Sequence, residues 1–319
     1  MKSLYVADIE KFSTGQPIEQ VVFALADIEV RTSAAGAPYL SLTLTDVTGA
    51  IRGVLFDQGT IPTEYSLGDT VVVSGVFNKD YNNIRLQHIQ KYEGGIDWND
   101  FLSSSSKDKD EMYRELLATA EAVTNPYLRV LLLDVFGDAE IEGKFKMLPG
   151  AKEIHHAYIG GLLEHTLAVI KLCETTAGLY EVDRDLLIAG AMLHDIGKLE
   201  ELDLKLIVTY TDVGSLAGHS LLGSFFVRDR IRGIEGFPEQ LRENLLHIII
   251  SHLGNKEWGA IVEPMTLEAL LVFMADNTDA KANRYQTLIQ QQRPLEQDIS
   301  PRDYFLGTAV YAPKVQEES

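Results

Sequence analysis

The stretch AGAMLHDIGKLEEL, residues 189–202, begins like a buried helix and then departs from that pattern. Its apolar run ends at Leu193, and His194, Asp195 and Lys198 follow within five residues. Burying an imidazole beside a carboxylate is costly unless another group compensates the charge. The sequence therefore requires a compensating partner near His194 and Asp195.

The 319-residue chain has a globular composition, with 45% hydrophobic and 24% charged residues, and is long enough for two domains. No apolar run has the length of a membrane span, and the acidic, interrupted start MKSLYVADIEKF is unlike a signal peptide. The single cysteine, Cys173, excludes an intrachain disulfide and suits a reducing compartment. We therefore expect a cytoplasmic protein without a membrane partner.

The formal net charge of −19 opposes non-specific attraction to polyanions. A nucleic-acid substrate would therefore have to be held by a local basic groove, by bound cations, or by both.

From about Val21 to Glu93 the pattern is that of short β-strands. Alternating runs rich in Val, Ile, Leu and Thr are separated by Gly, Asp and Asn turns. Five such strands with one buried face suit a small closed barrel, and their order resembles an OB-fold of the nucleic-acid-binding kind. The expected strands cover residues 20–32, 38–49, 50–57, 69–80 and 83–93.

From Met112 onward the pattern is helical, with apolar residues at i, i+3 and i+4. The helices are expected within residues 111–123, 125–137, 160–180, 184–199, 219–234, 238–254 and 266–289. We predict a multidomain α and β protein, in which an N-terminal five-stranded OB-fold barrel precedes an all-α helical bundle. The predicted boundaries are 1–93 for the barrel, 94–111 for a Gly- and Ser-containing linker, 112–312 for the bundle and 313–319 for a tail.

Histidine is concentrated in the helical part: seven of the eight histidines lie between His155 and His252. A single histidine in an apolar helix is most often a hydrogen-bonded core residue. Several of them together with embedded aspartates are instead typical of a divalent metal site in a helical bundle. The embedded polar residues are His165, His194, Asp195, His219, His252 and Asp276.

This order of residues resembles the HD-domain superfamily of metal-dependent phosphohydrolases, and HDIGK is one of its more specific forms. The resemblance implies that His165, His194, Asp195 and Asp276 hold one metal. It implies a second metal on His219 and His252, with Asp195 bridging the two. Two cations held about 3.5–4 Å apart can share a hydroxide that attacks phosphorus in line. Lys198, near His194, would reach the phosphate, or else would be a surface lysine after a helix.

The resemblance extends over nearly the whole chain and narrows to the YhaM-type 3′→5′ exoribonucleases, also described as CMP-binding factors. It rests on the OB-like barrel followed by IHHAYIGGLLEHT, RDLLIAGAMLHDIGKLEEL, GHSLLGS, ISHLGNKEWGA and EALLVFMADNTDAKANR. It implies manganese-dependent shortening of single-stranded RNA, and also of DNA, from the 3′ end. Ligand type alone suits Mn²⁺, Fe²⁺ or Zn²⁺.

The chain departs from the family pattern at one place, with SHLG where the family often has SHHG. Some HD phosphodiesterases bind a third metal through a second histidine here and a glutamate one turn before the first ligand. This chain has Leu253 and Gly161 at those positions. We therefore expect two metals and not three.

For several further residues the sequence leaves more than one role open. His155 and His156 contact the scissile phosphate or the 3′ nucleotide, or they pack at a helix start. Trp258 stacks on a base or packs beneath a loop. Asp279, near Asp276, lies behind the metal ligands, faces phosphate, or belongs to a solvated face.

In the barrel, Lys79, Tyr81 and Arg85 are the expected nucleic-acid contacts, because aromatic rings stack on bases and cations pair with phosphates. Tyr81 lies in the polar turn NKDYNN and should be exposed. Further aromatic residues either join this surface or fill the barrel core: Tyr39, Phe56 and Phe77.

Two other functions stay open. One is another HD chemistry, either a nucleotide or cyclic-nucleotide phosphohydrolase or a di-iron oxygenase with the same ligands. The other is a non-catalytic nucleic-acid-binding regulator. A homo-oligomer is compatible with the sequence, which does not determine the oligomeric state.

Overall fold

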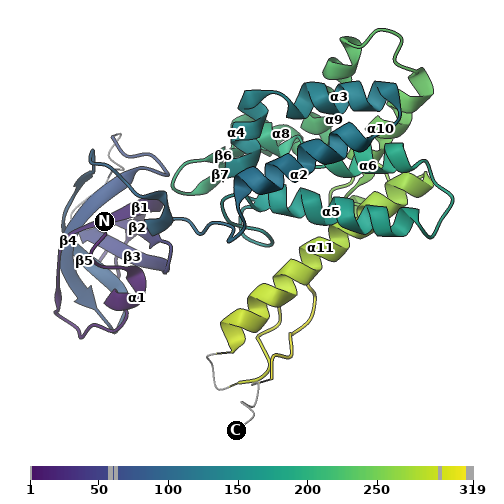
Figure 1. Ribbon diagram of the computed structural model, residues 1–319. Helices are drawn as coiled ribbons and strands as arrows, with labels where there is room; N and C mark the ends of the chain where they lie inside the picture. The colour runs from purple at the N-terminus through teal and green to yellow at the C-terminus, as the bar shows by residue number, and fades with distance from the viewer. Residues whose placement is uncertain (1, 57–59, 61–63, 294–296, 314–319) are drawn as a thin grey trace. The chain divides into compact units, whose positions relative to one another are not determined.

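The computed structural model describes residues 2–56, 60, 64–293 and 297–313 (Figure 1). The chain divides into two compact units, one of residues 1–104 with 204–209 and the other of residues 105–203 with 210–319. Apart from Pro313, the predicted tail at 313–319 lies outside the described residues.

The first unit is a closed five-stranded barrel with the strand order β1-β2-β3-β5-β4. Strands β3 and β5 pair in parallel and the remaining pairs are antiparallel. The predicted OB-like barrel is confirmed. The strands are β1 (Pro17–Thr32), β2 (Pro38–Asp46), β3 (Gly49–Phe56), β4 (Thr70–Asn78) and β5 (Asn83–Lys91).

The barrel interior is filled by apolar side chains from alternate strand positions and from the short helix α1 (Val6–Ile9), which contributes both of its ends. Phe77 is 1% exposed and belongs to this core, so it is not available to stack on a base. Leu206, from the 204–209 segment, packs with Ala24 and Phe101 of the same unit.

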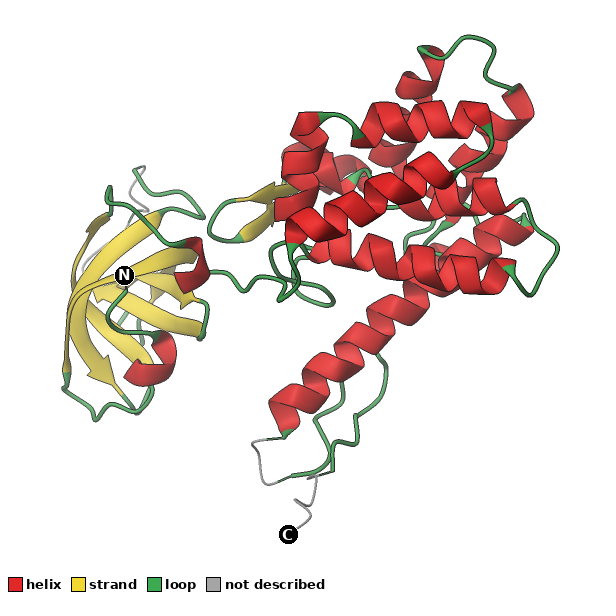
Figure 2. Ribbon diagram, viewed as in Figure 1, coloured by secondary structure: helices red, strands yellow, loops and turns green. Residues whose placement is uncertain are grey.

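The second unit is a bundle of helices, as the sequence predicted (Figure 2). Several helices begin at an aspartate or asparagine whose side chain accepts the first free N–H groups, as Asp108 and Asp183 do. The helices over residues 139–147 and 212–217 were not foreseen, and neither was a two-stranded hairpin, β6 (Leu202–Leu204) with β7 (Val208–Tyr210), whose residues 204–209 belong to the first unit. The helices are α2 (Lys109–Ala122), α3 (Pro126–Phe136), α4 (Ala139–Met147), α5 (Gly161–Ala177), α6 (Arg184–Leu193), α7 (Lys198–Glu201), α8 (Asp212–Ala217), α9 (His219–Arg232), α10 (Glu239–Ser251) and α11 (Leu267–Gln292).

Helix α6 is the centre of the bundle, and every one of its residues after Arg184 is buried. It packs against α5, α10 and α11. The first part of α11 lies against the bundle, and its second part extends beyond it (Figure 1). Among the described residues, no helix is both long and apolar enough to cross a membrane.

The expected helix over 184–199 is interrupted. Helix α6 ends at Leu193, His194 and Asp195 lie in a turn, and α7 starts at Lys198. Gly197 in this turn contacts the start of α9 so closely that a Cβ would lie 2.0 Å from the carbonyl oxygen of His219. The turn therefore brings the backbone of the HDIGK segment directly against α9.

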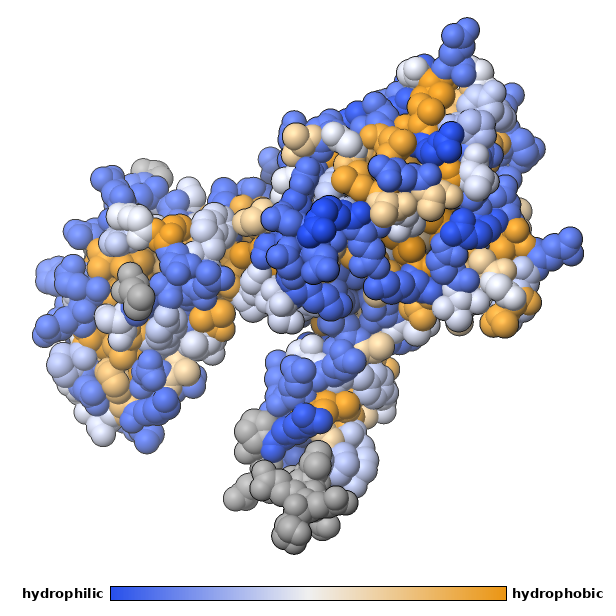
Figure 3. All heavy atoms as spheres, in the orientation of Figure 1, coloured by the Kyte–Doolittle hydropathy of each residue, from blue (hydrophilic) through white to orange (hydrophobic). Residues whose placement is uncertain are grey.

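On the face drawn in Figure 3, hydrophilic side chains surround smaller hydrophobic patches.

Candidate metal centre

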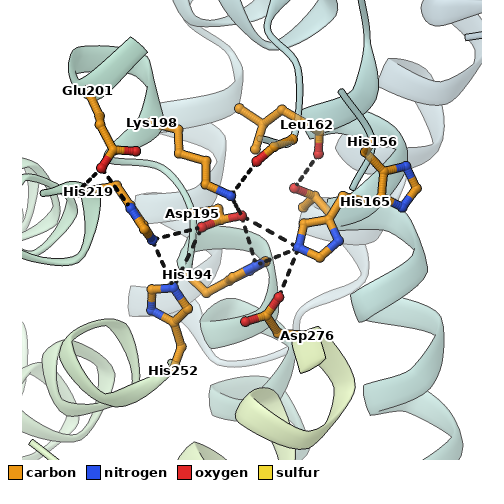
Figure 4. Close-up of polar contacts among 12 residues, drawn as sticks. His156, Leu162, His165, His194, Asp195, Lys198, Glu201, His219, His252 and Asp276 are labelled. Carbon is orange, nitrogen blue, oxygen red and sulfur yellow. Dashed lines mark hydrogen bonds and ion pairs between the residues drawn. The ribbon is translucent and has the colours of Figure 1, made fainter. Parts of the chain in front are cut away.

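The six predicted ligand residues converge on one point in the helical unit (Figure 4). Helices α5, α9 and α11 carry His165, His219 and Asp276, and the C-terminal ends of α6 and α10 carry the others. Each of the six side chains is at most 16% exposed. The bundle therefore buries four imidazoles and two carboxylates together.

The two oxygens of Asp195 face different pairs of histidines. Oδ2 lies 3.5 Å from Nε2 of His165 and 3.4 Å from Nε2 of His194. Oδ1 lies 3.5 Å from Nε2 of His219 and 3.6 Å from Nε2 of His252. On the first side, Asp276 Oδ1 is 3.2 Å from His165 Nε2. Asp195 therefore lies between two half-sites.

All four histidines turn the same nitrogen toward the centre. His194 Nδ1 is 2.8 Å from the Ala191 carbonyl oxygen, and His252 Nδ1 is 2.7 Å from that of Ile249. The Nδ1 atoms of the other two face carboxylates: His165 with Asp279 at 2.7 Å and His219 with Glu201 at 3.0 Å. Each acceptor requires a proton on Nδ1, so in the neutral imidazole the lone pair is on Nε2 and points into the centre.

The arrangement fits divalent cations. The Nε2 atoms of His165 and His194 are 3.3 Å apart, and so are those of His219 and His252. Two lone pairs facing each other at this distance repel unless a proton or a metal cation lies between or beside them. Buried imidazole and carboxylate donors are suitable ligands for Mn²⁺, Fe²⁺ or Zn²⁺. The centre is therefore suited to divalent metal, as the sequence predicted.

The electrostatics of the two half-sites differ. Burial alone would lower the pKa of His165, but Asp276 and Asp279 more than offset it and raise that pKa to about 9. Burial lowers the pKa of His252 to about 4. Burial would raise the pKa of Asp195, but Lys198 and His194 bring it well below its usual value. The His165 side thus favours positive charge more strongly.

Lys198 is buried, which excludes a surface lysine. Its ammonium donates to Asp195 Oδ2 at 2.5 Å and to the Gly150 carbonyl oxygen at 2.6 Å. Lys198 therefore holds Asp195 in place from the first residue of α7.

His155 and His156 lie beside the centre with different partners. His155 is half-buried and stacks on Phe305 at 5.9 Å, and its Nδ1 has no hydrogen-bond partner among the described residues. Burial lowers the pKa of His155 to about 3. His156 is buried, and its Nε2 lies 2.8 Å from Asp279 Oδ2.

The position that could have carried a glutamate for a third metal is closed. Gly161 begins α5, and a Cβ there would lie 1.9 Å from the His156 carbonyl oxygen. Trp258 is 56% exposed, so it is not packed beneath a loop. Lys281 lies 5.5 Å above its ring.

In the barrel, Tyr81 is exposed as expected, at 76%. The Arg85 guanidinium lies 5.3 Å from the ring of Phe56, which is itself 42% exposed. Tyr39 contacts the same ring. Lys79 is exposed at the end of β4. The barrel therefore presents aromatic and cationic groups together.

The sequence reasoning missed Glu201 and left Asp279 undecided among three roles. Asp279 follows Asp276 by three residues on α11, so helical periodicity places both on one face. Glu201 is separated from Asp195 by a turn, and no periodic pattern would have indicated it.

An OB-like barrel joined to a helical unit with this histidine and aspartate centre defines an HD-domain protein. The HD domain family model matches residues 162–281, a range that includes all six converging residues. The chain shares 14% identity with the PgpH phosphodiesterase HD domain of Listeria monocytogenes, with a TM-score of 0.28 over 53% of this chain and 85% of that one.

The family is narrower than the HD class. The chain is 30% identical over 298 residues to the 3′-5′ exoribonuclease YhaM of Bacillus velezensis, covering 91% of each chain. It is 31% identical to the Bacillus subtilis protein of the same name, covering 82% of this chain and 84% of that one. The chain belongs to the YhaM family, as its motifs predicted.

Proposed function

We propose that this protein is a divalent-metal-dependent 3′→5′ exoribonuclease acting on single-stranded RNA. The observation that supports this most directly is Asp195, whose two oxygens each face a separate pair of histidines. A carboxylate placed between two pairs of histidines in this way suits a pair of metal ions, and Mn²⁺ is the first candidate. The YhaM relatives support the direction of cleavage and the RNA substrate.

We assign the metal positions as the resemblance implied. His165, His194, Asp195 and Asp276 would hold one ion, and His219 and His252 would hold the second with Asp195. When bound, the pair would polarise a phosphodiester and lower the pKa of a water toward about 7. Lys198 fixes the bridging carboxylate through its bonds to Asp195 and Gly150, and its ammonium adds positive charge for a phosphate.

The chain's own groups also explain why cations are needed. Asp195 and Asp276 are both ionised, because Lys198 and His194 keep the pKa of Asp195, and His165 keeps that of Asp276, below the usual range. Without cations, these carboxylates would repel an approaching phosphate. His155, beside His165, and the exposed Trp258 are the proposed contacts for the terminal nucleotide, whereas His156 is buried against Asp279 and would support this loop from behind.

The barrel would capture the single strand. Tyr81 and the Phe56 ring beneath Arg85 offer stacking surfaces, and Arg85 and Lys79 offer positive charge for phosphates. This matches a protein with a net charge of −19, which needs a local cationic surface to hold RNA.

The test is a time course on a 5′-labelled single-stranded RNA with Mn²⁺, in parallel with EDTA, a 3′-phosphate-blocked RNA, matched DNA and Asp195→Asn. We expect a ladder that shortens from the 3′ end and stops with EDTA. Asp195→Asn should lose more than about 100-fold in rate. Substituting even a residue that only hydrogen-bonds to a metal ligand lowers metal affinity or activity by about 10–100-fold.

If the RNA stays intact although the wild-type protein is folded and loaded with metal, the proposed exonuclease activity is refuted. Hydrolysis of a mononucleotide or cyclic nucleotide by the same sample would then identify the other HD chemistry. Full activity of Asp195→Asn would place catalysis elsewhere and leave the helical unit a regulatory role.

A further inference from the structure

We propose that two carboxylates behind the histidines, Asp279 and Glu201, separately set the metal affinity of the two half-sites. The inference rests on the metal centre of the proposed function and adds two positioning residues to it. Neither carboxylate is one of the six residues that face the centre. Each contacts one histidine from behind, and the two histidines belong to different half-sites.

Asp279 acts on the first half-site. Its Oδ2 is 2.7 Å from His165 Nδ1 and 2.8 Å from His156 Nε2, so one oxygen accepts from two imidazoles. The His156 backbone N–H donates to Asn283 on the same helix, which fixes the loop against α11. Asp279 therefore sets the orientation of the His165 ring and ties it to the loop before α5.

Glu201 occupies the corresponding place in the second half-site. Its Oε1 is 3.0 Å from His219 Nδ1 and also accepts the backbone N–H of His219 at 3.0 Å. Glu201 is the last residue of α7 and is 8% exposed. A single carboxylate oxygen thus holds both the ring and the backbone at the start of α9.

The remaining two histidines have neutral partners. His194 and His252 donate to the backbone carbonyl groups of Ala191 and Ile249. A carboxylate behind an imidazole makes its free nitrogen a stronger donor than a carbonyl does, because the negative charge stabilises the cationic character that the ring gains on binding metal. Each half-site therefore contains one histidine with a carboxylate behind it, His165 or His219, and one histidine with a neutral carbonyl group behind it.

The experiment uses Asp279→Asn and Glu201→Gln in the whole 319-residue chain. Both changes remove the charge and keep an oxygen that accepts the hydrogen bond. Mn²⁺ binding to RNA-free protein is measured by competition with a chromophoric chelator, and wild type should bind two ions. Each variant should weaken one of them by about 10–100-fold and leave the other within about threefold.

The half-sites are distinguished by repeating both changes in a His219→Gln background. There the remaining ion lies in the His165 half-site, so Asp279→Asn should weaken it and Glu201→Gln should not. Asp185→Asn is the matched control. Asp185 is a buried carboxylate of α6 that accepts hydrogen bonds from Thr124 and Asn125, so this variant tests the loss of a buried charge without contact to a histidine.

Unchanged Mn²⁺ affinities in both variants would overturn the inference, and so would equal weakening of both ions by Asp185→Asn. Normal RNA shortening alongside unchanged affinities would leave the proposed function standing and reject only the positioning role. Selective weakening together with an inert wild type on RNA would support the positioning role and reject the exonuclease.

Discussion

At the scale of single residues, the centre depends on which imidazole nitrogen carries the proton. Four different acceptors hold a proton on Nδ1 of the four histidines, two of them carboxylates and two of them carbonyl groups. Folding therefore turns the four Nε2 atoms toward Asp195 before any ion binds. This prearrangement lowers the cost of assembling a ligand shell.

His247 provides a pH-dependent contribution to stability away from the ligands. Its Nε2 accepts the backbone N–H of Met265 at 2.8 Å, and burial lowers its pKa below 6.5. The unfolded chain binds this proton more readily, so the contribution is full above pH 6.5 and is lost as pH falls through the lowered pKa.

His247→Gln keeps an acceptor for Met265 but does not titrate. Urea unfolding in EDTA should therefore show a shallower loss of free energy of unfolding between about pH 7 and pH 5 than wild type shows. The difference in slope should stay below about 1.4 kcal/mol per pH unit, the limit for one proton. Parallel slopes for the two proteins would contradict this role.

At the scale of elements, the site is made at helix ends. His194 and His252 directly follow the last residues of α6 and α10 and cap these helices, and His219 begins α9. A helix end allows a side chain to leave the cylinder of the helix at an angle that a mid-helix position does not offer. The turn at 194–197 therefore directs the side chains of His194 and Asp195 into the centre, which a continuous helix would not do.

Gly197→Ala tests this turn. Its Cβ would meet the backbone of His219 and Gly223 at 2.0 and 2.5 Å, so α9 must move away from α7. We expect a loss of about 1–3 kcal/mol in the free energy of unfolding, as for overpacked cores, and weaker binding of the ion at His219. Both are measurable by denaturant titration and chelator competition.

The control for this substitution is Gly143→Ala. Gly143 is exposed in α4, and a Cβ there would meet nothing within 4 Å. This variant should gain about 0.4–1 kcal/mol, because alanine loses less backbone entropy on helix formation. A Gly197→Ala protein as stable as wild type would show that α9 does not require the close contact.

At the scale of the whole molecule, capture of RNA and cleavage of RNA are assigned to different units. The chain is acidic overall, and yet on the barrel Arg85 lies over the exposed Phe56 ring and Lys79 is exposed. The carboxylates of the helical unit need cations before they accept a phosphate. In the proposed function, the two units would therefore meet the same polyanion with different sources of positive charge.

Barrel variants should separate these two steps. Tyr81→Ala should weaken binding of a long single strand by about 1–3 kcal/mol, and Arg85→Ala should reduce the salt dependence of that binding by a slope of about 0.7. Hydrolysis of a dinucleotide should be unchanged. Tyr180→Ala, at a tyrosine of the helical unit that is 55% exposed, is the control. Equal losses on both substrates would reject the division of labour.

The sequence by itself determined the five strands of the barrel, the longer helices of the bundle and the six residues of the centre, but not α1, α4, α8 or the β6–β7 hairpin. Alternation and helical spacing depend on near neighbours along the chain, and a polar residue in an apolar run is visible without a structure. Only the tertiary structure decided that the two oxygens of Asp195 face different pairs of histidines, that Lys198 is buried against Asp195, and that Asp279 and Glu201 lie behind two histidines. Asp279 and His165 are 114 residues apart. Their contact depends on how α5 packs on α11, and no local pattern records that packing.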